Sequence, residues 1–149
     1  MPQVTRGTSA TLWTLGESAR EDCVLLAHAL PKDIAPTVYT SPDPKAAETA
    51  AVVALRLGLQ TTRDARLSEV DRPPVWDEDY RSMVLALEAD PKGDVIVSNH
   101  GIVLSLYAAS ITAIDLREFW RQLTFPDAWR LDLETKTLER LYEGGLPPE

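Results

Sequence analysis

Side chains that could do chemistry follow three short β-prone or apolar runs, at points where a strand would turn into a helix. Arg6 and Thr8 stand in the first of these turns, Lys45 in the second and His100 in the third. Together they supply cations, hydroxyl groups and one imidazole. In open α/β folds such turns lie beyond the carboxyl ends of the strands, where helix N-termini favour anions. This set of residues indicates a phosphate site.

A candidate proton donor stands farther along the chain. Glu69 could take this role if a dry pocket raised its pKa, and Asp71 is a nearby competitor. Acidic side chains are abundant here, and a solvated carboxylate is their default state. Arg6 and Lys45 could equally be solvated cations, and His100 could be satisfied by backbone hydrogen bonds in a turn. The phosphate hypothesis therefore depends on whether the fold brings these residues together.

The sequence indicates no cofactor or metal site. No spacing of His, Cys, Asp and Glu fits a metal site, and neither common glycine-rich nucleotide loop occurs. Trp76, Trp120 and Trp129 are predicted to pack in the core or over the site. Cys23 is the single cysteine and falls within a helical apolar stripe, so we expect it to fill the core.

Two helices are predicted in the N-terminal part of the chain, where apolar side chains recur at intervals of three and four residues. The first begins at a capping box formed by Thr14 and Glu17 and ends before Pro31. A β-prone run, residues 37–40, leads directly into the second helix, which Gly58 is placed to end. This part of the chain is therefore expected to alternate helices and strands.

The alternation continues in the second half of the chain. A third helical stripe spans residues 80–87. Residues 94–98 (DVIVS), with consecutive apolar side chains at their centre, predict a strand covered on both faces, followed by another helix. Two β-prone runs, residues 129–133 and 137–142, predict a terminal hairpin. We therefore expect an α/β fold, a three-layer α/β/α sandwich with a mostly parallel central sheet, as a single domain over residues 1–149.

The composition limits the class of protein and its partners. The chain has 149 residues, of which 44% are hydrophobic and 26% charged, as is typical of a globular protein with one core. Its net charge of −8 repels polyanions such as nucleic acids. The longest apolar runs are shorter than the roughly 20 residues of a membrane-spanning helix, and no apolar signal segment opens the sequence. We expect a cytoplasmic protein that binds neither nucleic acid nor membrane.

Two motifs in the first third of the chain resemble those of the histidine phosphatase superfamily, the phosphoglycerate-mutase-like proteins. Residues 12–16 (LWTLG) resemble the family's leucine-threonine-x-x-glycine motif. Residues 39–50 (YTSPDPKAAETA) resemble its serine-proline-x-x-arginine-x-x-glutamine-threonine-alanine motif, with Lys45 and Glu48 as substitutions. Lys45 keeps the positive charge of the family's arginine but loses the fork that grips two phosphate oxygens.

Two later motifs follow in the family's order. Residues 67–69 (LSE) are similar to the segment that often brings in the proton donor, and residues 97–101 (VSNHG) resemble the second histidine-glycine motif. The resemblance implies a phosphoglycerate-mutase-like fold and a site that includes Glu69 and His100. It also implies a mechanism in which a histidine attacks phosphorus to form a phosphohistidine while a carboxyl group protonates the leaving oxygen.

The sequence departs from the family at the N-terminal motif. The family's arginine-histidine-glycine-glutamate aligns with residues 5–8 (TRGT), so Arg6 occupies the position of the nucleophilic histidine, or Gly7 does if the register shifts by one. Neither can be phosphorylated as histidine is. Arg6, Gly7 and Thr8 are still expected to contribute to phosphate binding. The histidine at position 28, His28, falls opposite the buried stripe of the first helix and is expected at the surface.

Three functions remain open at this point. The leading hypothesis is a protein with a degenerate phosphate pocket, which is catalytically impaired or non-catalytic and keeps its binding of phosphate or a small phosphorylated ligand. The second is an active phosphatase or mutase acting on a small phosphoester, which would use His100 or a hydroxyl such as that of Thr8 or Ser9 as nucleophile.

The third hypothesis is an interaction module, including a homodimer. The candidate patch contains Phe119, Trp120, Phe125 and Pro126. These side chains are more readily explained as packing on the sheet.

Overall fold

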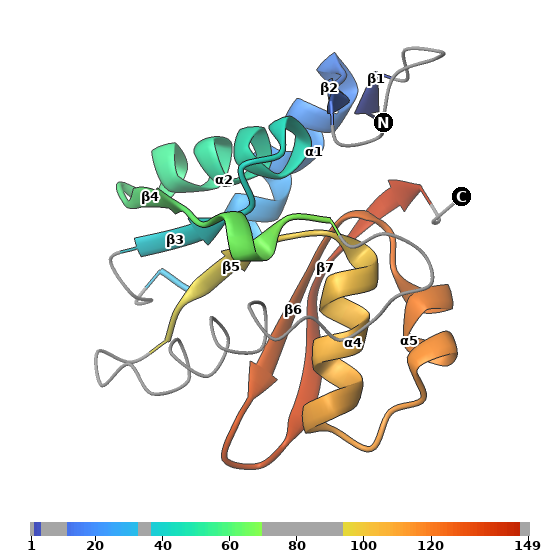
Figure 1. Ribbon diagram of the computed structural model, residues 1–149. Helices are drawn as coiled ribbons and strands as arrows, with labels where there is room; N and C mark the ends of the chain where they lie inside the picture. The colour runs from blue at the N-terminus through green and yellow to red at the C-terminus, as the bar shows by residue number, and fades with distance from the viewer. Residues whose placement is uncertain (1, 4–11, 33–36, 70–93, 147–149) are drawn as a thin grey trace.

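The chain folds into alternating helices and strands, and the computed structural model describes residues 2–3, 12–32, 37–69 and 94–146 (Figure 1). In chain order the elements are β1 (Pro2–Gln3), β2 (Thr14–Leu15), α1 (Glu17–Ala29), β3 (Thr37–Thr40), α2 (Pro44–Leu57), β4 (Gln60–Arg63), η2 (Ala65–Leu67), β5 (Ile96–Ser98), α4 (Gly101–Ile111), α5 (Leu116–Gln122), β6 (Phe125–Asp132) and β7 (Thr137–Leu146). The helix expected over residues 80–87 lies outside the described residues.

Three parallel strands form the central sheet in the order β4-β3-β5. The strands predicted at residues 37–40 and 94–98 are confirmed as β3 and β5. The second of these is half-buried rather than covered on both faces. β4 was not predicted, because all four of its side chains are exposed and give no apolar pattern. β4 can pair in parallel with β3 because α2 connects the two strands and brings the chain back to the end of the sheet where β3 begins.

Helices cover both faces of the strands. The terminal hairpin is confirmed as β6 and β7. On one side, Ala128 and Tyr142 of the hairpin pack against the core that α1 and α2 share. On the other side, Trp129 and Leu138 pack against the buried side chains of α4 and α5. The order helices, strands, helices confirms the three-layer α/β fold (Figure 1).

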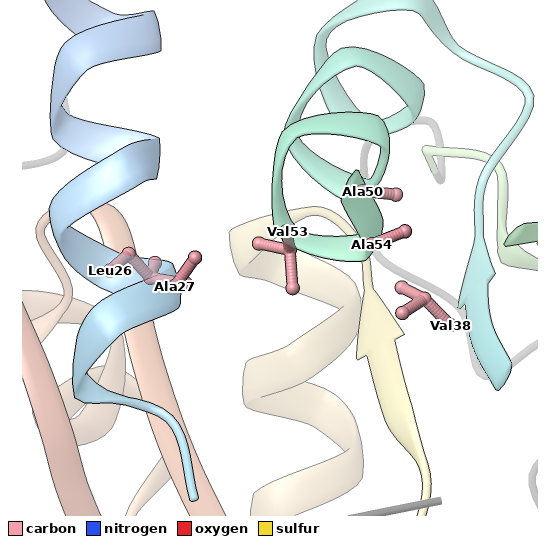
Figure 2. Packing of buried hydrophobic residues seen from close by; sticks show 6 residues of the cluster. All are labelled: Leu26, Ala27, Val38, Ala50, Val53 and Ala54. Carbon is pink, nitrogen blue, oxygen red and sulfur yellow. The ribbon is translucent and has the colours of Figure 1, made fainter. Parts of the chain in front are cut away.

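Small side chains form the core between α1, α2 and β3. Figure 2 shows Leu26 and Ala27 of α1 facing Val53 of α2, with Val38 of β3 on the sheet side. Val38 is fully buried. Cys23 of α1 is also fully buried, as predicted for a core residue. The short side chains let the two helices and the sheet approach closely.

One prediction about helix boundaries is wrong. The expected capping box fails because Thr14 lies in β2, where it pairs with β1, and the N-cap of α1 is Gly16 without a side-chain cap. The backbone N–H of Leu15 donates to the Glu48 carboxylate at 3.1 Å, which holds this segment extended. Glu17 is consequently the first residue of the helix rather than its third.

Two other helix ends are as expected. α1 ends at Ala29, shortly before Pro31. α2 ends at Leu57. Its C-cap, Gly58, adopts a left-handed conformation with φ of 67° and donates its N–H to the Ala54 carbonyl. Within the described ranges, no helix is long and apolar enough to cross a membrane.

Candidate functional site

The carboxyl ends of β3 and β5 bring together two turns that are far apart in the sequence. Thr40 and Ser98 are register partners at these ends, and the next residue, Ser41, donates its backbone N–H to the Ser98 carbonyl at 3.2 Å. The Oγ atom of Ser41 then lies 3.0 Å from Nε2 of His100. Ser41 is fully buried and His100 is only 4% exposed. The parallel pairing of the two strands therefore creates a buried hydroxyl–imidazole contact.

Three charged side chains complete this group. Oδ2 of Asp43, the N-cap residue of α2, lies 2.9 Å from Nε2 of His100. The Nζ atom of Lys45 lies 2.7 Å from Oε2 of Glu69, and the same oxygen lies 3.7 Å from Nδ1 of His100. We call Ser41, Asp43, Lys45, Glu69 and His100 the His100 cluster. The structure thus brings together Lys45, Glu69 and His100, three of the residues that the sequence indicated.

Burial is the main influence on the titration of His100. It lowers the pKa of the imidazole below its ordinary value of 6.5, because the charged form is poorly solvated inside the protein. The nearby ammonium of Lys45 acts in the same direction, whereas the carboxylates of Glu69 and Asp43 oppose it. The imidazole is therefore neutral at neutral pH and carries one proton.

The position of that proton follows from the partners of Nε2. A carboxylate can only accept hydrogen bonds, so the 2.9 Å contact with Asp43 requires a proton on Nε2 of His100. The Ser41 hydroxyl oxygen accepts the backbone N–H of Asp43 at 3.1 Å. In this arrangement Nε2 is a donor, and the lone pair of the ring lies on Nδ1, on the side of Glu69.

Two further N–H groups near the cluster are buried and have no hydrogen-bond partner within the described residues. They are Nε1 of Trp13 and Nδ2 of Asn99. Lys45 lies over the Trp13 ring, with Nζ 6.0 Å from the ring centroid. The Asn99 side chain accepts the backbone N–H of His100 through its oxygen, at 2.8 Å. Such donors are costly to bury alone, and an acceptor such as a ligand oxygen would satisfy them.

The glycine after His100 allows α4 to begin close to α5. A Cβ atom at Gly101 would lie 2.6 Å from Cζ3 of Trp120, so any other residue there would require the Trp120 ring to shift. α4 and α2 both start shortly after the carboxyl ends of their strands, so their first backbone N–H groups lie at the same end of the sheet. Helix starts of this kind favour anions only in combination with suitable side chains.

The other residues singled out in the sequence have different positions. Arg6, Gly7 and Thr8 lie outside the described residues, and so do Ser9, Asp71 and Trp76. His28 is exposed in the last turn of α1, as predicted.

The aromatic residues predicted to pack in the core do so where they are described. Trp129 lies 5.0 Å from Phe119, centroid to centroid, in an edge-to-face arrangement. Phe119 is buried and Trp120 packs against the same core, so half of the candidate interaction patch is internal. Phe125 remains exposed at 38%.

Ser41, Asp43 and Trp13 were not chosen as site residues from the sequence. Ser41 and Asp43 stand in one of the three turns, but nothing in their types distinguishes them from ordinary turn and capping residues. Trp13 lies in the segment that resembles the family's motif. Among the described residues, no group of three or more His, Cys, Asp or Glu side chains is arranged as a metal site.

Comparison with known proteins gives matches at the level of structure. No family model matches the sequence, and no curated protein sequence is significantly similar. A mycobacterial hydrolase superposes with a TM-score of 0.62 at 17% identity, over 90% of this chain and 88% of its own. Mycobacterial glucosyl-3-phosphoglycerate phosphatase in complex with VO3 gives a TM-score of 0.59 at 17% identity, over 89% and 88% of the two chains.

The same phosphatase with inorganic phosphate gives a TM-score of 0.61 at 15% identity, over 97% of this chain and 94% of its own. The solved structures that resemble this chain include members of the histidine phosphatase superfamily, at 12–19% identity. The chain therefore has the phosphoglycerate-mutase-like fold that its sequence motifs predicted.

Proposed function

We propose that this chain is a histidine-phosphatase-like protein that binds phosphate or a small phosphorylated ligand at the His100 cluster and turns over phosphoesters slowly or not at all. The observation that carries the proposal is the meeting of Lys45 and His100 at the starts of α2 and α4, at the carboxyl end of the parallel sheet. This is the edge at which α/β proteins of this architecture bind ligands.

The donors around the cluster support the binding part of the proposal. Lys45 offers an ammonium, and Trp13 and Asn99 offer buried N–H groups that lack partners in the described part of the chain. A tetrahedral oxyanion has enough acceptor oxygens for all of them. Structures of a phosphatase with the same fold contain inorganic phosphate and VO3.

The histidines support the catalytic part of the proposal. The segment where the family has its nucleophilic histidine reads TRGT, and His28 is an exposed residue of α1. His100 is almost fully buried, and the proton on Nε2 removes the lone pair that this nitrogen would need to attack phosphorus. Of the two histidines, His28 therefore lies outside the cluster, and His100 lacks a free lone pair on Nε2 with which to form a phosphohistidine.

One observation favours the alternative of an active phosphatase. The Ser41 hydroxyl lies 3.0 Å from Nε2 of His100, and Glu69 lies on the far side of the ring. A serine nucleophile, a histidine base and an orienting carboxylate can transfer acyl or phosphoryl groups. This use of His100 requires its proton to move from Nε2 to Nδ1 and the fully buried Ser41 to become accessible.

Two assays on the purified protein test these proposals together. The first measures release of phosphate from a generic aryl phosphate, and the second measures binding of inorganic phosphate by calorimetry. We expect no turnover above background and measurable phosphate binding, which His100→Ala and Lys45→Ala each weaken at least tenfold.

The exposed His28→Ala is the matched control and should bind phosphate like the wild type. Turnover that is lost in both Ser41→Ala and His100→Ala would establish the serine alternative and refute the proposed impairment. Absence of phosphate binding in the wild type would refute the proposed function as a whole.

Three expectations from the sequence stay predictions within this proposal. They are the single domain over residues 1–149, the cytoplasmic location and the homodimer. Size-exclusion chromatography with light scattering would test the homodimer directly.

A further inference from the structure

The carboxylate of Asp43 is held in a fixed position within the His100 cluster. Its Oδ2 atom contacts Nε2 of His100 at 2.9 Å and accepts the backbone N–H of Glu69 at 3.2 Å. The backbone N–H of Asp43 itself donates to Oγ of Ser41 at 3.1 Å. Contacts at both ends of the residue thus restrain it, and 13% of its side chain remains exposed. A ligand at the cluster therefore meets this carboxylate where it stands.

The cluster carries more negative than positive charge. Lys45 contributes one positive charge, and Asp43 and Glu69 contribute one negative charge each. Burial keeps His100 neutral by lowering its pKa. Lys45 is already paired with Glu69 at 2.7 Å. Among the described side chains, the neutral imidazole is therefore the partner of the Asp43 carboxylate, which also accepts a backbone N–H. An incoming anion is therefore repelled unless it can satisfy this carboxylate.

Two oxyanions of the same shape differ in this respect. Phosphate and phosphoester monoanions keep a P–O–H group, whereas sulfate carries no proton near neutral pH. A carboxylate can only accept hydrogen bonds, so it gains a strong, charge-assisted bond from the P–O–H group of phosphate or a phosphoester monoanion. Sulfate has no hydrogen to donate, so its negative oxygens and the Asp43 carboxylate would repel each other in a partly buried site of low dielectric constant.

We infer that Asp43 makes the His100 cluster selective for oxyanions that carry a proton, so that it accepts phosphate and phosphoester monoanions and rejects sulfate. The inference rests on the proposed function, because it presupposes that phosphate binds at this cluster. A fixed repulsive group can set specificity by lowering the affinity for the ligand that cannot satisfy it, here sulfate. Sites that are built around a hydrogen bond from a ligand O–H reject analogues without it by large factors.

The test compares inorganic phosphate with sulfate by calorimetry on the full chain. We expect the wild type to bind phosphate at least tenfold more tightly than sulfate. In Asp43→Asn the carboxamide can donate as well as accept hydrogen bonds. The variant side chain therefore no longer repels sulfate and can donate a hydrogen bond to it. The affinity for sulfate should rise at least tenfold, and the ratio of the two affinities should approach one.

Asp64→Asn is the matched control for loss of one charge. The carboxylate of Asp64 pairs with Arg66 at 2.7 Å rather than with a member of the cluster. Asparagine at this position can still accept the backbone N–H of Arg66, which Asp64 now caps at 2.9 Å. The ratio of phosphate to sulfate affinity should therefore be that of the wild type.

The outcomes separate this inference from the proposed function. If the wild type binds phosphate and sulfate equally well, or if Asp43→Asn keeps the selectivity, the inference is wrong and the proposed function stands. If the wild type binds neither anion, both are wrong. A thermal melt identifies a variant that does not fold, in which case Asp43→Ser supplies a second neutral side chain that can donate a hydrogen bond.

Discussion

Lys45 stands where the family that the sequence resembles has an arginine, and it is the one ammonium in the His100 cluster. Its Nζ atom forms an ion pair with Glu69 that is about one-fifth exposed. Arg at this position would keep the ion pair and add the planar fork that binds two oxygens of one phosphate. The identity of this cation should therefore control how tightly phosphate binds.

We expect Lys45→Arg to bind inorganic phosphate about tenfold more tightly than the wild type, because bidentate charge-assisted bonds are the strong ones. Calorimetric titration measures the change. Lys32→Ala removes a positive charge from an exposed residue outside the cluster and should leave the affinity unchanged. Unchanged affinity in Lys45→Arg would show that phosphate does not reach this side chain.

His100 should make the stability of the protein dependent on pH. Burial lowers its pKa in the folded state below the ordinary 6.5, so the unfolded chain binds a proton more readily. Above pH 6.5 the imidazole is neutral in both the folded and the unfolded state, so its titration does not reduce the free energy of unfolding. As the pH falls from 6.5 through the folded pKa, the unfolded chain takes up the proton first and the free energy of unfolding decreases. Wild type should therefore lose stability in this acidic window.

Urea unfolding at several pH values tests this expectation against His100→Gln, which cannot titrate. The difference in unfolding free energy between the two proteins should shrink as the pH falls below 6.5. A difference that stays constant over this range would mean that His100 has the same pKa in both states.

At the level of residues, the sequence indicated three of the five members of the His100 cluster. Lys45, Glu69 and His100 were found because parallel strands end at one edge of a sheet and because their motifs occur in a recognisable order. Asp43 was not found, since an aspartate before a helix is ordinarily an N-cap. Its contact with His100 depends on the register of β3 and β5, which the sequence does not specify.

At the level of elements, α4 and α5 depend on the absence of a side chain at Gly101. A Cβ atom there would approach Trp120 to 2.6 Å, Phe125 to 3.2 Å and Leu123 to 3.3 Å. Gly101→Ala should destabilise the protein by about 1–3 kcal/mol, the usual cost of overpacking. It should also weaken phosphate binding, because His100 is the neighbouring residue.

Gly145→Ala is the control for this prediction, since a Cβ atom at Gly145 has no neighbour within 4 Å. Urea unfolding of both variants gives the comparison. Equal stability of Gly101→Ala and Gly145→Ala would mean that α4 and α5 are not packed as described.

Helices and strands with an apolar stripe were predicted well, and those without one were not. α1, α2 and β3 were recognised from their spacing and their ends. β4 was missed because its side chains are exposed, and no helix was predicted at the position of α5. The false capping box at Thr14 arose because the same residue pattern also fits a strand that is held by Glu48.

At the level of the whole molecule, the layered architecture followed from the alternation of strands and helices and from the family resemblance. The identity with the similar structures reported above is 12–19%, so local motifs carried more information than overall similarity. The hairpin that joins the two helical layers was predicted from its β-prone runs. What the motifs did not supply was the pairing order β4-β3-β5, which depends on long-range contacts.

The position of the terminal hairpin between the helical layers also affects how the chain folds during its synthesis. The apolar face of α1 packs against Ala128 and Tyr142, so it gains its full set of neighbours only after about 100 further residues have been made. At ~5–20 residues per second this takes roughly 5–20 s. During that time Leu26 and its neighbours lack the two hairpin side chains of their final core. A nascent chain of this protein should therefore bind a ribosome-associated chaperone until β7 has left the exit tunnel.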